Sequence, residues 1–179
     1  MIEAMYQRRS IRKYAPEPVG QEEARQIIAA ALLAPSSHNR KPCRFLVADD
    51  RELLDKLAAA KEHGAEFLRE APLAIVVMAD ESVSDIWVED AAIAASYIQL
   101  AAQAVGINSC WSQIRERRRS EKSSEWAEDY LRELLGLEPQ IRVLAIIALG
   151  RGARTKPART DGELVWENVS FNTMAKGKS

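Results

Sequence analysis

Two stretches of the chain carry apolar side chains at almost every position, which is typical of β-strands covered on both faces. They are residues 73–79 (LAIVVMA) and 141–149 (IRVLAIIAL). Two shorter segments, residues 44–48 (RFLVA) and 107–112 (INSCWS), also have strand composition. We therefore predict four strands that form one central sheet.

Apolar positions at helical spacing predict helices between and before these strands. In residues 21–33 the apolar side chains share one face, and Pro35 stops the helix. The other helices are expected at residues 2–9, 51–63, 86–105 and 124–135, and Gly64 is expected to close the second of these. Residues 91–104 are rich in alanine, which suits a buried central helix or a subunit interface.

The order of these elements predicts an α+β fold with three layers and one central sheet. Residues 1–152 should form a single domain. Beyond it, residues 153–179 are polar with scattered apolar side chains and no helical period. We expect this C-terminal extension to pack on another surface, such as a second subunit.

Composition narrows the classes of function. The 179 residues carry a net charge of −1, so nothing global attracts the chain to nucleic acid or to an acidic membrane. The apolar runs are shorter than the ~18 residues of a transmembrane helix, and the charged N-terminus does not resemble a signal peptide. Cys43 and Cys110 make no disulfide framework, and we expect a cytoplasmic protein.

Common catalytic and metal-binding motifs are missing from the sequence. His38 and His63 have no partner at metal-ligand spacing, and no metal site is expected. The chain has no GxGxxG, P-loop or GxSxG motif. The one basic run, RERRR at residues 115–119, has glutamates around it and is interpreted as a solvated turn.

Three polar segments are candidates for binding chemistry. RRSIRKY (residues 8–14) clusters guanidinium groups that match a phosphate, or it is a solvated basic turn. PSSHN (35–39) offers short hydrogen-bonding side chains, or it is a connecting loop. SCWSQ (109–113) follows a strand, where backbone amides can line a crevice, or it is a strand–loop junction.

Taken in order, these segments resemble the nitroreductase family. RRSIRKY is similar to the family's N-terminal flavin motif, and APSSHNRKPCRF (34–45) to its APSSxNxQPW segment. The alanine-rich helix followed by VGINSCW resembles the long central helix and the next strand. LRELLGL (131–137), with the strand after it and Gly150, matches the approach to the C-terminal segment. The resemblance covers residues 1–152 and, more loosely, the extension.

The resemblance implies a nitroreductase-like fold with a mainly antiparallel sheet, and a homodimer with FMN sites across its interface. Arg12 would lie near the N1–C2 edge of the flavin, where a cation stabilises the charge of the reduced ring. The implied FMN-binding residues are Arg8, Arg9 and Ser10 at the phosphate and ribityl end; Pro35, Ser36, Ser37 and Asn39 from the other subunit; Cys110, Trp111, Ser112 and Gln113 beside the ring; and Gly150, Lys156 and Arg159, the last two at the phosphate.

The activity implied by the resemblance is hydride transfer from NAD(P)H, through flavin N5, to an electron-poor acceptor such as a nitroaromatic or a quinone. The scheme is ping-pong and needs no catalytic side chain. Same-fold flavoenzymes that remove halogen or cleave reduced flavin with oxygen remain alternatives, as does a non-enzymatic flavin-binding protein. The chain departs from the family pattern at Lys41, at Cys43 and at Arg151–Gly152.

Overall fold

The computed structural model describes residues 2–172. Its sheet has four strands in the order β1-β2-β4-β3, namely β1 (Cys43–Ala48), β2 (Leu73–Asp80), β3 (Asn108–Gln113) and β4 (Ile141–Gly150). Every neighbouring pair is antiparallel. The two apolar runs form the central strands and are buried almost throughout. The predicted α+β fold with an antiparallel sheet is confirmed.

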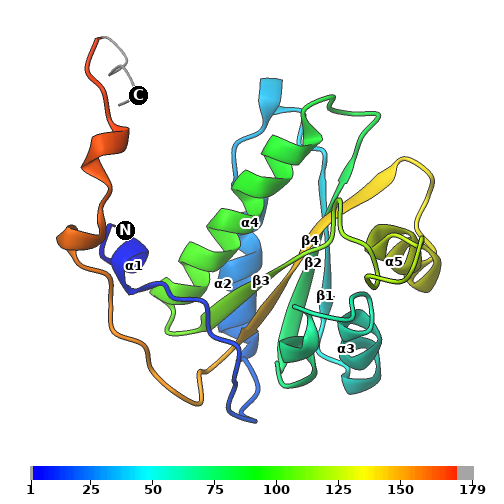
Figure 1. Cartoon of the computed structure of the whole chain (residues 1–179), viewed down its shortest axis with the longest axis horizontal. Coiled ribbons are helices and arrows are strands. Elements are labelled where there is room, and N and C mark those ends of the chain that lie inside the picture. The colour runs from blue at the N-terminus through cyan, green and yellow to red at the C-terminus, as the bar shows by residue number, and fades with distance from the viewer. Residues whose placement is uncertain (1, 173–179) are drawn as a thin grey trace.

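Helices cover both faces of the sheet and make the predicted three layers (Figure 1). One face carries α2 (Gln21–Leu32) and α4 (Trp87–Ala104), and the other carries α3 (Arg51–Ala58) and α5 (Ala127–Leu135). A short helix, α1 (Ile2–Gln7), lies against α4. The alanines of α4 let it pack closely against all four strands and against α2.

The strands end within one residue of their predicted limits, and four of the five helices within three residues. The helix predicted over residues 51–63 is wrong in its second half, because α3 ends at Ala58. Beyond it Ala60 is buried, the Glu62 N–H donates to the Arg119 carbonyl at 2.7 Å, and Gly64 has φ of 80°. These tertiary contacts override the high helix propensity of the local sequence.

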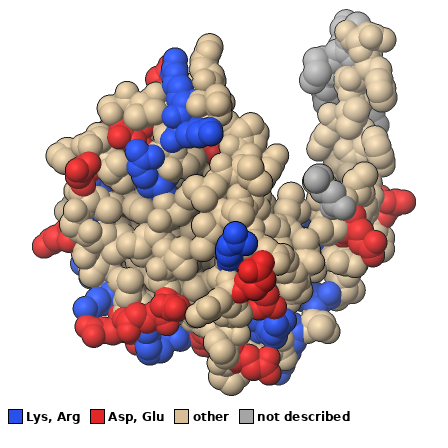
Figure 2. Space-filling model, turned by 180° about the vertical axis from the view of Figure 1, so that it is seen from behind, with Lys and Arg blue, Asp and Glu red and all other residues tan. Residues whose placement is uncertain are grey.

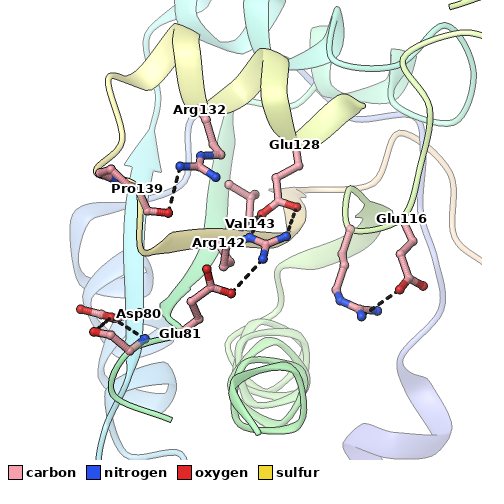
Figure 3. A network of polar contacts seen from close by, with 10 residues as sticks. Asp80, Glu81, Glu116, Glu128, Arg132, Pro139, Arg142 and Val143 are labelled. Carbon is pink, nitrogen blue, oxygen red and sulfur yellow. Dashed lines mark hydrogen bonds and ion pairs between the residues drawn. The ribbon is translucent and has the colours of Figure 1, made fainter. Parts of the chain in front are cut away.

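A buried carboxylate joins α5 to β4 (Figure 3). Glu128 is 7% exposed and accepts hydrogen bonds from Arg142 at 2.7 and 2.9 Å and from the Val143 N–H at 2.9 Å. Arg142 also pairs with Glu81 at 2.8 Å. Hydrogen bonding to Glu128 raises the pKa of Arg142 above its usual value. Removal of Arg142 would leave the buried Glu128 carboxylate without its charged partner, so this pair anchors α5 to the sheet.

Residues 160–172, here called the arm, stand away from the body (Figures 1 and 2). The arm is held near α1 by the Tyr6 hydroxyl, which donates to Asp161 at 2.7 Å. Its apolar side chains are 40% to 81% exposed, namely Leu164, Val165, Trp166, Val169 and Phe171. Residues 173–179 of the predicted extension lie outside the described residues.

Within residues 2–172, no helix is long and apolar enough to cross a membrane. In the same part of the chain, no group of three or more His, Cys, Asp or Glu side chains could hold a metal ion. Cys43 and Cys110 are both free thiols.

Gly150 provides a test of the packing at the end of β4. A Cβ atom here would lie 2.6 Å from Cδ of Pro72 and 2.9 Å from Cδ1 of Tyr14. Both neighbours are ring atoms with little freedom to move. We expect Gly150→Ala to reduce the free energy of unfolding by about 2 kcal/mol or more, because overpacked cores lose roughly that much.

Urea unfolding followed by circular dichroism would measure the change. Gly162→Ala is the matched control, because a Cβ there meets only Thr160 Oγ1 at 3.8 Å. We expect the control to change the free energy of unfolding by less than about 0.5 kcal/mol. Equal stability of the two variants would contradict the packing described for Gly150.

Candidate functional site

The N-terminal segment lies along the free edge of β3. Ser10 forms a parallel bridge with Ser109, and the Ile11 N–H donates to the Ser109 carbonyl at 3.1 Å. Ile11 and Tyr14 are 5% and 7% exposed and anchor the segment in the core. The apolar residues of RRSIRKY therefore fix the path of the chain, and its basic side chains are left to line the edge of the sheet.

Four basic side chains, here called the basic cluster, gather at this edge: Arg8, Arg9, Arg12 and Lys156. Burial raises the pKa of the Cys110 thiol, and the positive charges of Arg12, Lys156 and Arg8 oppose that rise. The Lys156 ammonium donates to the Ser10 carbonyl at 3.0 Å. Arg9 donates to the Pro157 carbonyl at 2.5 Å.

No member of the basic cluster forms an ion pair within residues 2–172. Arginines in other parts of the chain do pair with carboxylates, namely Arg40, Arg51, Arg119, Arg142 and Arg151. The hydrogen bonds of Arg9 and Lys156 go instead to neutral carbonyl oxygens. Like charges held together without counter-charges form a favourable site for an anion.

A cleft of about 230 Å³ opens beside the basic cluster. Its lining contains two of the four cations and no acidic side chain: Gln7, Arg9, Ile11, Gln103, Asn108, Thr155, Lys156 and Ala158. Its size and charge suit a phosphate with part of the group that carries it. Arg159 differs from the cluster, because its guanidinium lies 3.9 Å from Glu163 and its backbone N–H donates to the Tyr6 carbonyl.

The residues of β3 divide into two sets. Cys110 and Ser112 are 1% exposed, so their side chains belong to the core. Trp111 and Gln113 are half-buried, and the indole N–H of the first donates to the amide oxygen of the second at 2.8 Å. Ser109 directs its carbonyl away from β4, and in an antiparallel pair every second residue does the same. The backbone groups of Trp111 and Gln113 therefore face the free edge, beside the basic cluster.

The PSSHN segment forms a tight loop whose Ser36 and Ser37 are half-buried and whose Asn39 is exposed. The loop contains left-handed residues that are not glycine, with φ of 50° at His38, 56° at Asn39 and 52° at Lys41. Such residues are uncommon and need support from their surroundings.

Within one chain, the loop and the basic cluster are far apart. The loop contacts Asp90, in the first turn of α4, whereas the cleft is lined by Gln103, in the last. At 1.5 Å per residue, the helix separates these two positions by roughly 20 Å. The structure thus brings the segment 8–12, Lys156 and β3 together, but it places residues 35–39 at the other end of the molecule.

Two polar contacts near these segments were not found from the sequence. Arg151 pairs with Glu23 at 2.6 Å and so ties the end of β4 to the start of α2. The Asp90 carboxylate accepts the Ser37 N–H at 2.8 Å. A signal for Asp90 was present, since it lies beside Ala91 on the buried face of α4, where an acid is unusual.

The family model described as "Nitroreductase family" matches residues 5–62 and 57–151. A protein from Archaeoglobus fulgidus named as an NADH dehydrogenase/NAD(P)H nitroreductase is 39% identical over 153 residues, which cover 83% of each chain. An FMN-dependent nitroreductase from Clostridium difficile has a TM-score of 0.93 and 43% identity, over 97% of this chain and 99% of that one.

A further solved structure, described as a nitroreductase in complex with FMN from Desulfovibrio desulfuricans, has a TM-score of 0.71 and 31% identity. The match covers 92% of this chain and 94% of that one. The family model spans the fold and all three polar segments that carried the resemblance. The chain belongs to the nitroreductase family.

Proposed function

We propose that the protein is an FMN-dependent NAD(P)H oxidoreductase. The observation that carries the proposal is the basic cluster, four cations without carboxylate partners in the described chain, beside a strand edge that directs backbone groups outwards. FMN has an anionic phosphate and a ring whose polar edge needs hydrogen-bond partners. The FMN named in the descriptions of the C. difficile and D. desulfuricans proteins supports the same cofactor here.

The residues present fit this cofactor in charge and placement. Arg8, Arg9, Ser10 and Lys156 would hold the phosphate and ribityl end, next to the cleft of about 230 Å³. Arg12 would place a fixed cation at the N1–C2 edge of the ring. Backbone groups at Trp111 and Gln113 would line the ring, because their side of β3 is not paired with β4.

Other predicted contacts are weaker in the structure. Cys110 and Ser112 are weak candidates for FMN contacts, since both side chains are buried and their backbone groups pair with β4. Packing against Pro72 already accounts for the glycine at position 150. The ion pair of Arg159 with Glu163 gives it a local partner, so Lys156 is the stronger candidate at the phosphate.

When bound, FMN would supply the redox chemistry, by taking a hydride from NAD(P)H and passing it to an electron-poor acceptor in a ping-pong sequence. The protein's part is to bind, orient and stabilise charge. Arg12 would favour the reduced cofactor electrostatically. This scheme requires no nucleophile or general acid from the chain. The proposal includes a cytoplasmic location and an acceptor of the nitroaromatic or quinone class.

We further propose a homodimer in which residues 35–39 complete the site of the partner. The roughly 20 Å between this loop and the basic cluster prevents both from reaching one ligand ring within a single chain. Apolar surface supports a partner, because Ile93 and Tyr97 of α4 and its capping residue Ile86 are about 40% exposed. An apolar groove of about 490 Å³ runs along α2, and the arm would pack on the other subunit. Residues 1–152 would then form the FMN-binding domain, and residues 153–179 would be a C-terminal extension that packs on the partner subunit.

The first test is an absorption spectrum of the purified protein. We expect a yellow protein, or one that retains FMN after reconstitution. Its absorption bands should lie near those of free flavin. It should oxidise NADH or NADPH when a quinone or a nitroaromatic is present. A colourless protein that cannot be reconstituted with FMN would overturn the proposed function.

Arg12→Ala tests the electrostatic role at the flavin edge. We expect the flavin potential to fall and kcat/KM to drop by about tenfold or more, since each factor of ten corresponds to about 1.4 kcal/mol of lost transition-state stabilisation. Lys13→Ala is the matched control, because Lys13 is an adjacent and exposed cation. If turnover and potential were the same in both variants, Arg12 would have no special role.

Trp166→Glu tests the dimer. Trp166 is 65% exposed in a single chain, and the arm around it has little contact with its own body. A charge here should raise the dissociation constant of the dimer at least tenfold, as measured by sedimentation equilibrium. Lys122→Glu, on an exposed turn, should leave the constant unchanged. A wild-type protein that sediments as a monomer at micromolar concentration would rule out the shared site.

A further inference from the structure

The support of the left-handed loop comes from one buried carboxylate on α4. Asp90 is 2% exposed, and its two oxygens accept separate hydrogen bonds. One comes from the Ser37 N–H at 2.8 Å, and the other from the Ser84 hydroxyl at 2.8 Å. Ser84 is itself 1% exposed. Asp90 thus connects the loop after α2 with the turn before α4.

The Asp90 side chain does not serve its own helix. The backbone N–H of Asp90 already bonds to the Ile86 carbonyl, and Ile86, the residue that caps α4, makes no side-chain capping bond. Burial of a carboxylate is costly, and its compensating donors come from two loops rather than from α4. The buried position of Asp90 is therefore explained by its bond to Ser37, which helps to hold the conformation of residues 36–41.

The loop has few bonds of its own to maintain this conformation. The Asn39 N–H donates to the Ser36 carbonyl at 2.9 Å, and the Lys41 N–H donates to the Ser36 hydroxyl at 2.9 Å. Both bonds lie within the loop, and neither fixes the loop to the body. Arg40 pairs with Asp85 at 3.2 Å, but both side chains are exposed, and an exposed ion pair contributes little. Among the described contacts of Ser37, His38 and Asn39, the bond to Asp90 is the one that attaches them to the core.

We infer that Asp90 is a positioning residue for the flavin site of the partner subunit, which it serves by fixing the Ser37 backbone. This inference rests on the proposed function and adds to it a residue that no motif contains. Loss of the carboxylate would free the three left-handed residues to relax. The serine and asparagine groups of the loop would then no longer be pre-organised for the neighbouring cofactor.

The test compares three variants with one control, all as full-length dimers. Asp90→Ala removes the bonds to both Ser37 and Ser84. Asp90→Asn keeps an acceptor for the Ser37 N–H, and Ser84→Ala removes only the bond between Ser84 and Asp90. Glu128→Gln is the matched control, because Glu128 is another buried carboxylate that accepts a backbone N–H, but it lies in the α5 layer. The readouts are the thermal midpoint and the FMN dissociation constant from fluorescence titration.

We expect Asp90→Ala to raise the FMN dissociation constant by tenfold or more, and Asp90→Asn and Ser84→Ala to raise it by less than threefold. Glu128→Gln should lower the thermal midpoint and leave FMN affinity unchanged. If Asp90→Ala binds FMN like the wild type, or if affinity falls with the thermal midpoint in the control as well, the inference is wrong. A wild-type protein that binds no FMN would instead refute the proposed function.

Mixed dimers separate action across the interface from action within one chain. One mixed dimer joins an Arg9→Ala chain, which lacks a proposed phosphate contact, to an Asp90→Ala chain, and the other joins a chain with both substitutions to a wild-type chain. If Asp90 acts on the partner, the first has one intact FMN site and the second has none. Titration that finds the intact site in the second dimer would overturn the inference.

Discussion

The hydrogen bond between Ile11 and Ser109 is the contact on which the candidate site depends. Without it, β3 would be an open edge, and the basic residues 8–12 would have no fixed place. With it, Ile11 enters the core and the flanking arginines are held against the strand. The same contact protects the start of β3, because an unpaired edge invites association with other chains. The rest of that edge stays free for a ligand.

Much of the fold could be predicted because the apolar pattern reports burial. β2 and β4 were recognisable since strands covered on both faces are apolar throughout. The pattern failed where contacts distant in sequence decide the structure. The helix after Arg51 ends early because the chain must reach Arg119, and its alanine-rich sequence carries no sign of that. The strand order β1-β2-β4-β3 likewise depends on contacts that periodicity does not encode.

The candidate site could be predicted as a set of segments but not as a geometry. The order of the motifs indicated residues 8–12, 35–39 and 109–113, and the structure places the first and third side by side. Sequence could not reveal that the Trp111 backbone faces the edge while the Cys110 backbone pairs with β4, because that depends on the pairing register. Nor could it reveal the left-handed residues of the loop, which a carboxylate 53 positions away supports.

The departures at Arg151 and Gly152 make sense as a different way to stiffen the same turn. The family pattern has glycine–tyrosine–proline where this chain has Gly150, Arg151 and Gly152, and that proline would fix the backbone by restricting φ. Here Arg151 pairs with Glu23, whose other oxygen accepts the Gly20 N–H, so the turn is tied to the start of α2. These bonds hold the pKa of Glu23 below its usual value, the Gly20 N–H having the largest effect. The Gly152 N–H donates to the Asn108 side chain at 2.8 Å. The turn directs the chain back towards Lys156, so the change in sequence preserves the path that brings this cation to the site.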